Sequence, residues 1–325
     1  MNNSDYNKIT QRYATMREEA TEKHKASMND LYTNHPVLKE LDDTLHSLYM
    51  QLARARLFHD NPAILRTEEN ISNTKQVKEQ YLKDNNIPLS VYDIKYNCPK
   101  CKDTGLLEDS THCECFYKYA SELYFENALT PECRKLTFES FDSSVFEEVP
   151  ISPQKSTTVR SYMCDIKACL EKYCQNLQSQ EKKNVLLCGN TGTGKTFLLY
   201  CMANALLANG HSVLFARSFT MFNELFDAYI SDNSTLNSMM DNLINVDVLI
   251  IDDLGMELKK RNFTLNILTS ILDERMHSSK HTFISTNYSL KQLQEEYTDK
   301  VFSRMVNAKN TLCIQTVGRD IRLSV

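Results

Sequence analysis

One eight-residue loop constrains the fold of this chain more than any other feature. Residues 189–196 read Gly-Asn-Thr-Gly-Thr-Gly-Lys-Thr, a complete Walker A pattern. The apolar run 185–188 precedes the loop, and a helical pattern, 197–203, follows it. A phosphate-binding loop needs this strand–loop–helix context, so the pattern favours a nucleotide site over a chance match.

Each part of the loop has a predicted role. The glycines let backbone N–H groups turn toward phosphates, and the helix N-terminus adds a positive dipole. Lys195 would reach the β- and γ-phosphates, and the Thr196 hydroxyl would bind Mg²⁺. The predicted ATP-binding residues are Gly189, Asn190, Thr191, Gly192, Thr193, Gly194, Lys195 and Thr196.

A second motif is an apolar strand that ends in two carboxylates. Residues 247–255 read Asp-Val-Leu-Ile-Ile-Asp-Asp-Leu-Gly, a Walker B segment. Asp252 would hold Mg²⁺ directly or through water. Asp253 stands where many such ATPases have a Glu that orients the attacking water, and its side chain is one methylene shorter. The alternative is that both acids cap the next helix; the Walker A loop favours the nucleotide role.

Four cysteines form two close pairs. Cys98 and Cys101 are separated by eleven residues from Cys113-Glu114-Cys115. Four thiolates in two tight turns predict a structural tetrahedral zinc site, with His112 as an alternative ligand to Cys113 or Cys115. A redox dithiol, an iron–sulfur cluster and four free thiols remain as rivals. The second pair and the lack of a βαβ context argue against the dithiol, and the spacing is not a common one for an iron–sulfur cluster.

The composition is that of an ordinary soluble globular protein. The chain has 325 residues, is 42% hydrophobic and 24% charged, and carries a net charge of −5. This charge argues against broad electrostatic binding of nucleic acid but leaves room for a local basic site. No apolar run approaches the roughly 20 residues of a membrane span, and the N-terminus lacks a signal-peptide core. We therefore expect a cytoplasmic protein with no membrane contact, whose seven other cysteines are reduced thiols.

The periodicity of apolar residues predicts two regions. Helical patterns cover about 5–34, 36–59 and 62–85, followed by the zinc segment at about 92–120, and another helix covers about 156–178. Beyond these, strands and helices alternate, which predicts a parallel sheet with helices on both faces. The expected strands are 184–188, 212–217, 247–252, 282–286 and 311–316. The expected domains are a helical, zinc-binding 1–130 and an ATPase 131–325.

The ordered set of motifs resembles bacterial replicative helicase loaders of the DnaC/DnaI type, which are AAA+ ATPases with an IstB-like ATP-binding core. The resemblance is strongest over 130–322 and looser in the cysteine-bearing front half. The segments that carry it are Thr137–Asp142, the Walker A loop, Ile250–Gly255, Asp273–Arg275, Ser285–Leu290, Phe302–Met305 and Gly318–Arg322.

This resemblance implies a fold and further site residues. The fold is an AAA+ P-loop NTPase core with a five-stranded parallel sheet and no C-terminal lid, since only three residues follow Arg322. Asn287 becomes sensor I, Arg304 an arginine finger offered to a neighbouring subunit, and Arg322 the sensor II arginine. On the residues alone, Asn287 is either a contact of the γ-phosphate or the attacking water or an ordinary loop-start residue. Arg304 is either an arginine finger or a surface arginine.

The function implied is Mg²⁺-dependent ATP hydrolysis that is stimulated by self-association through the ATPase domain. The front domain would bind the replicative DNA helicase, and the ATPase domain would contact single-stranded DNA while the helicase is loaded during replication initiation or restart. DNA contacts would fall between the second and third strands and near Walker B. The DNA candidates are Arg217, Phe219, Lys259, Lys260 and Arg261, although the basic run is equally a solvated helix start.

Two other functions compete with the loader. The first is an IstB-type ATPase helper of a transposase, which shares the run Asp252–Gly255 but usually lacks a cysteine segment like this one. The second is an adaptor that binds ATP without significant turnover. The intact set of Lys195, Asp252, Asn287 and Arg304 argues against the adaptor.

Overall fold

A computed structural model describes residues 3–128, 130–154, 156–258, 260 and 263–323. The chain divides into two compact units. One is Thr10–Thr111, and the other joins Met1–Ile9 to His112–Val325. The functional boundary expected near residue 130 stays a prediction.

The first unit is helical. Leu45 and Leu52 of α2 pack with Ile71 of α3 in a small apolar core, and Pro36 opens α2 at the position that tolerates a missing N–H. The patterns predicted at 5–34, 36–59 and 62–85 are confirmed as helices. The elements are α1 (Asn3–Asn34), α2 (Pro36–Leu57), α3 (Asn61–Asp84) and the 3-10 turn η1 (Leu89–Tyr92).

A shared carboxylate ties these elements together. Asp42 of α2 accepts hydrogen bonds from the hydroxyls of Tyr32 at 2.9 Å and Tyr92 at 2.8 Å. It also pairs with Lys78 of α3, whose ammonium lies 3.9 Å from the ring centroid of Tyr92. One acid thus links α1, α2, α3 and η1, and burial together with the Asp42 hydrogen bond raises the pKa of Tyr32 to about 12.

The second unit is an α/β domain. Its strands are β1 (Asn184–Cys188), β2 (Val213–Arg217), β3 (Val248–Leu254), β4 (His281–Thr286) and β5 (Thr311–Gln315). They form one sheet in the order β2-β3-β4-β1-β5, and every pairing is parallel. The five predicted strands are therefore confirmed to within two residues at each end. β4 lies between β1, which precedes the Walker A loop, and β3, which contains the Walker B segment.

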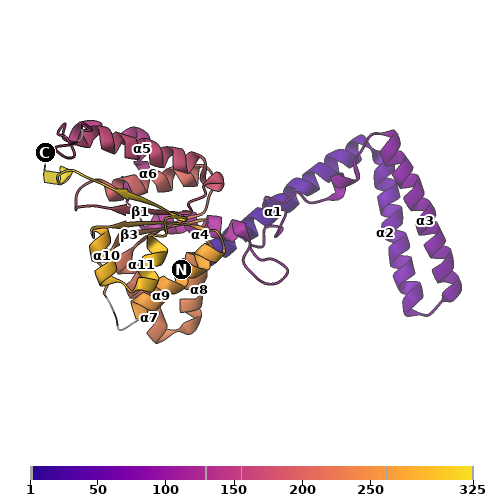
Figure 1. The fold of residues 1–325 in the computed structure, drawn as a ribbon. Helices are drawn as coiled ribbons and strands as arrows, with labels where there is room; N and C mark the ends of the chain where they lie inside the picture. Colours follow the sequence, from indigo (N-terminus) through magenta and orange to yellow (C-terminus); the bar gives the residue numbers. More distant parts are fainter. Residues whose placement is uncertain (1–2, 129, 155, 259, 261–262, 324–325) are drawn as a thin grey trace. The chain divides into compact units, whose positions relative to one another are not determined.

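Helices cover both faces of this sheet (Figure 1). α5 and α6 lie on one face, and α7 to α11 lie on the other. All five residues of β1 and the first five of β3 are buried, as expected for parallel strands covered on both sides. The helices of this unit are α4 (Glu114–Ala128), α5 (Val159–Gln175), α6 (Lys195–Ala208), α7 (Ser218–Ser231), α8 (Asn233–Asn245), α9 (Phe263–His277), α10 (Leu290–Glu296) and α11 (Asp299–Met305).

Short elements complete the unit. The helix α4 packs along β2 and covers an edge of the sheet that would otherwise be open. The 3-10 turns are η2 (Cys133–Lys135), η3 (Phe138–Ser140), η4 (Ser143–Val145), η5 (Leu177–Ser179) and η6 (Ile321–Leu323). None of the described helices combines the length and apolarity that a membrane span requires.

A fully buried arginine joins α9 to the carboxyl end of α8. Arg275 of α9 has no exposed surface, and its guanidinium donates to the carbonyls of Leu243, Ile244 and Val246 at 2.8–2.9 Å. These carbonyls end α8 and would otherwise lack partners. Burial lowers the pKa of Arg275 to about 9.

Candidate nucleotide-binding site

The phosphate loop joins β1 to α6. Gly192 and Gly194 have φ values of 76° and 90°, a left-handed conformation that suits glycine. The Lys195 ammonium lies across the loop and donates to the carbonyl oxygens of Gly189 and Asn190, both at 2.7 Å. Burial lowers the pKa of Lys195, while the charges of Asp253 and Asp252 oppose that shift. The predicted loop therefore presents its cation beside the two Walker B acids.

The side chains of Thr196, Asp252 and Ser285, from three different elements, meet at one point. The Thr196 hydroxyl of α6 donates to Asp252 Oδ1 at 3.1 Å, and the Ser285 hydroxyl of β4 donates to the same oxygen at 2.6 Å. Asp252 is 2% exposed, and burial raises the pKa of its carboxyl, against the hydrogen bonds of Ser285 and Thr196. A carboxylate and a hydroxyl in contact offer the oxygen ligands that Mg²⁺ prefers.

Asp253 adopts a strained backbone conformation. Its φ is +56°, and the pairing of β3 with β4 shifts register between Ile251 and Leu254. Such a bulge re-aims a side chain and is common beside functional sites. The backbone is held there by two serines: the Asp253 N–H donates to Ser285 Oγ at 2.9 Å, and the Ser218 hydroxyl donates to the Asp253 carbonyl at 2.6 Å.

Asn287 follows β4 directly and faces the second acid. Its amide Nδ2 lies 3.5 Å from Asp253 Oδ1. The structure thus brings Lys195, Thr196, Asp252, Asp253 and Asn287 together at the carboxyl ends of β1, β3 and β4. This is the edge at which open parallel sheets bind ligands.

Thr316, the residue after β5, contacts the phosphate loop. Thr316 and Thr193 share a hydroxyl–hydroxyl hydrogen bond of 2.7 Å. A Cβ at Gly189 would lie 2.3 Å from Thr316 Oγ1, so only glycine fits there. Arg322, predicted as sensor II, pairs with Asp320 at 2.8 Å.

Arg304 lies on α11 and is engaged with α9. Its guanidinium pairs with Asp273, with Nη2 at 3.1 Å from Oδ2, and its Nη1 donates to the Lys300 carbonyl at 2.7 Å. An action on a neighbouring subunit's nucleotide stays a prediction.

The DNA candidates occupy different surroundings. Arg217 ends β2, paired in register with Asp252, and Phe219 of α7 is 49% exposed. The Lys260 ammonium lies 4.1 Å from the ring centroid of Phe226. Lys259 and Arg261 lie outside the described residues. A role in DNA binding stays a prediction for all five.

The predicted metal ligands gather in one place. The sulfur atoms of Cys98, Cys101, Cys113 and Cys115 all lie within 4.8 Å of one another. A tetrahedral ZnS₄ site with bonds of about 2.3 Å places its sulfurs about 3.8 Å apart, so the four thiols fit zinc. The Asp103 carboxylate accepts the Cys98 N–H at 2.7 Å and shapes the first turn.

His112 is directed to other partners. Its ring stacks on Phe116 with centroids 3.8 Å apart, and its Nδ1 lies 3.7 Å from Asp241 Oδ2. The four-thiol set therefore stands without the histidine.

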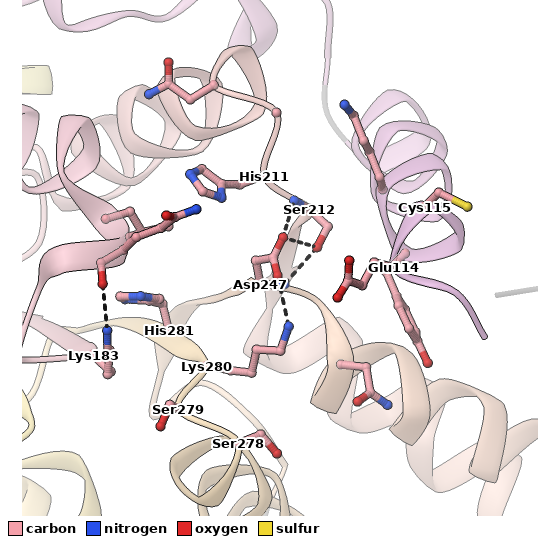
Figure 2. A pocket seen from close by; sticks show the side chains of 17 residues that line it. Glu114, Cys115, Lys183, His211, Ser212, Asp247, Ser278, Ser279, Lys280 and His281 are labelled. Carbon is pink, nitrogen blue, oxygen red and sulfur yellow. Dashed lines mark hydrogen bonds and ion pairs between the residues drawn. The ribbon is translucent and has the colours of Figure 1, made fainter. Parts of the chain in front are cut away.

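A cavity of about 640 Å³ lies at the opposite, amino-terminal edge of the sheet (Figure 2). Asp247 faces it and accepts hydrogen bonds from Lys280 Nζ at 2.9 Å and from the Ser212 N–H and hydroxyl at 3.0 and 2.9 Å. α6, α8 and α9 end at this edge, and helix carboxyl ends favour nearby cations. Lys280 is paired with Asp247, and Lys183 donates to the Gln178 carbonyl at 3.4 Å, so we assign the cavity no ligand.

Some site residues escaped the sequence patterns. Ser285 and Ser218 hold the Walker B backbone, and Thr316 holds the phosphate loop. Ser285 stands in the run Ser285-Thr286-Asn287 at the end of β4, and this run was the only signal for it. The others become neighbours of the site through crossover connections that the sequence does not specify.

Fold and site together have the features of a P-loop nucleotide-binding domain, with a Walker A loop and a Walker B segment at the carboxyl edge of a five-stranded parallel sheet. Residues 167–310, less than half of the chain, match the family model described as IstB-like ATP binding protein. This segment runs from α5 to the residue before β5 and contains both Walker motifs and Asn287.

The curated relatives that this chain matches include replicative helicase loaders. The replicative helicase loader DnaC of Buchnera aphidicola (Baizongia pistaciae) is 29% identical over 42% of this chain and 54% of its own length. The loader DnaI of Bacillus subtilis is 26% identical over 48% of this chain and 47% of its own. The chain thus spans about half the length of the curated relatives it matches, and the predicted likeness to DnaC/DnaI loaders is confirmed.

A solved structure described as that of DnaI covers 60% of this chain and 94% of its own, with 22% identity and a TM-score of 0.45. At these values the alignment adds no weight to the assignment.

Proposed function

We propose that this protein is an ATP-dependent loader that binds the replicative DNA helicase in the cytoplasm and helps to place it on single-stranded DNA. The meeting of Thr196, Asp252 and Ser285 beside Lys195 carries the ATP-dependent part of the proposal. The relatives named as helicase loaders support the choice of partner.

The residues suggest how ATP would be held. Lys195 would exchange the carbonyls of Gly189 and Asn190 for phosphate oxygens. The negative charge of the phosphate would offset the free-energy cost of burying the ammonium. Thr196 and Asp252 would hold Mg²⁺, which when bound neutralises phosphate charge.

The residues also suggest how hydrolysis would proceed. Asp253, fixed by the bulge and facing the Asn287 amide, would orient the attacking water and accept its proton. Arg304 from an adjacent subunit would stabilise the charge on the γ-phosphate, so turnover would require assembly.

The front part of the chain is proposed as the docking region. By the resemblance, residues 1–130 bind the helicase and the four-cysteine loop binds zinc. Zinc would hold the two cysteine turns together, because a loop with little apolar content gains its stability from the metal.

Phosphate release from ATP tests the enzymatic part. At concentrations at which the chains self-associate, wild type should hydrolyse ATP, Lys195→Ala should fail to bind it, and Asp253→Asn should bind ATP but hydrolyse it about 100-fold more slowly. Asp165→Asn, an exposed carboxylate on α5, is the matched control. Equal rates for Asp253→Asn and wild type would contradict the assigned base, and ATP binding without turnover in wild type would favour the adaptor.

The transposase helper remains the second candidate, because the matching family model is IstB-like. A complex of the full chain with a transposase, together with no complex with the host replicative helicase under any nucleotide condition, would establish it instead.

A further inference from the structure

The segment after β5 returns to the phosphate loop. The Ile321 N–H donates to the Gly192 carbonyl at 3.0 Å. A Cβ added at Gly192 would lie 1.9 Å from Asp320 Oδ1 and 2.6 Å from Oδ2. The Asp320 carboxylate therefore rests directly on the backbone of the loop that is to receive phosphate.

The same carboxylate holds Arg322. The arginine Nε donates to Asp320 Oδ1 at 3.0 Å, and Nη2 donates to Oδ2 at 2.8 Å. The Arg322 N–H also donates to Oδ1, at 3.0 Å. This is the two-pronged geometry in which a guanidinium binds a carboxylate or a phosphate interchangeably.

Arg322 is close enough to the site to act on its charges. Burial is the main cause of the lowered pKa of Lys195, and Arg322 lowers it further. The hydrogen bond with Asp320 is the main cause of the raised pKa of Arg322, and Asp253 adds to it. The Arg322 guanidinium therefore interacts electrostatically with Lys195 and Asp253 of the nucleotide site. At the same time it is hydrogen-bonded to Asp320 of its own segment.

We propose that Asp320 is a positioning residue that holds Arg322 beside the phosphate loop until the γ-phosphate of ATP replaces the carboxylate as its partner. This inference rests on the proposed ATP-binding function. Asp320 opposes ATP binding because it competes with the γ-phosphate for Arg322. Asp320 and Arg322 lie in the segment after β5. Exchange of the Asp320 carboxylate for the γ-phosphate therefore couples nucleotide binding to the position of that segment.

The expected effect is modest because the ion pair is largely exposed. Asp320→Asn should tighten ATP binding by about twofold to fivefold. ADP binding should change less, because ADP lacks the phosphate that Arg322 receives. Arg322→Gln should weaken ATP binding, and the double variant should bind ATP as weakly as Arg322→Gln alone.

Titration of the full chain with a fluorescent ATP analogue and its ADP counterpart tests this cycle. Glu147→Gln is the matched control: Glu147 pairs with Arg319 of the same segment at 3.2 Å. It should leave the affinity unchanged, and thermal unfolding should show that every variant is folded. A gain that persists in the Arg322→Gln background, or no gain in Asp320→Asn, would overturn the exchange.

Lys195→Ala separates failure of this inference from failure of the proposed function. If wild type binds the analogue and Lys195→Ala does not, ATP binding stands whatever Asp320 does. If both bind equally poorly, ATP binding and the exchange fail together.

Discussion

The Thr196 hydroxyl lies 3.1 Å from a carboxylate oxygen of Asp252, although 56 positions separate the two residues. The strands that carry these motifs, β1 and β3, are not neighbours, because β4 lies between them. Ser285 of β4 fills that gap and donates to the same oxygen. The predicted magnesium ligands are therefore positioned by a third strand whose serine belongs to neither Walker motif.

Ser285→Ala should impair hydrolysis more than ATP binding. The hydroxyl donates to Asp252 and accepts the Asp253 N–H. Its loss leaves the Asp253 N–H without this partner and Asp252 Oδ1 with the Thr196 hydrogen bond alone, at a cost of about 1–3 kcal/mol. We expect the hydrolysis rate to fall about tenfold or more. Steady-state phosphate release beside nucleotide titration measures the split. Ser231→Ala removes a hydroxyl that is bonded within its own helix, so it should change neither the hydrolysis rate nor ATP binding. Equal hydrolysis rates in the two variants would contradict the role of Ser285.

His281 should make the fold sensitive to acid. Burial lowers its pKa to about 4 from 6.5, and its ring meets the Tyr173 hydroxyl at 3.1 Å. Between pH 6.5 and 4 the unfolded chain binds more protons than the folded one, so stability falls as the pH falls through this window, by at most about 3 kcal/mol.

Urea denaturation across this pH range measures the effect. His281→Gln should flatten the dependence, while His277→Gln, which removes an exposed histidine, should leave it intact. An unchanged slope in His281→Gln would show that other groups cause the acid sensitivity.

Much of the fold followed from short-range patterns. The five strands alternate with helices, and both Walker motifs lie where strand ends predicted them. Contacts made by crossover connections did not follow. The run Asp273-Glu274-Arg275 resembles a charged helix surface, yet Arg275 is fully buried because α8 ends against it. The positive φ of Asp253 depends on a bulge set by β4, which no local pattern encodes.

Zinc should bind the four-cysteine loop with one equivalent per chain. The four sulfurs lie within 4.8 Å of one another, so Cys101→Ser should abolish stoichiometric zinc and lower the stability of the loop. Elemental analysis of purified protein, with thermal unfolding before and after chelation, provides the measurement. Cys169→Ser, an exposed cysteine on α5, should retain the metal. Retention of full zinc by Cys101→Ser would contradict the ligand set.

Arg304 should act across a subunit interface. Within its own chain it pairs with Asp273 and donates to the Lys300 carbonyl. We expect Arg304→Ala to bind ATP normally but to lose the stimulation of hydrolysis by assembly. Mixing it with Lys195→Ala should restore part of the activity, because one chain supplies the loop and the other the arginine. Absence of any recovery at every mixing ratio, with both proteins folded and associating, would argue that Arg304 is an ordinary surface residue.

Helicase loading itself is tested most directly with the host replicative helicase, closed circular single-stranded DNA and the full-length protein. DNA-bound helicase is separated by gel filtration and quantified with ATP, without nucleotide and with Lys195→Ala. An ATP-dependent loader predicts that helicase appears on DNA only when wild-type protein and ATP are both present. Equal loading by Lys195→Ala, or no loading and no helicase complex under any condition, would contradict it.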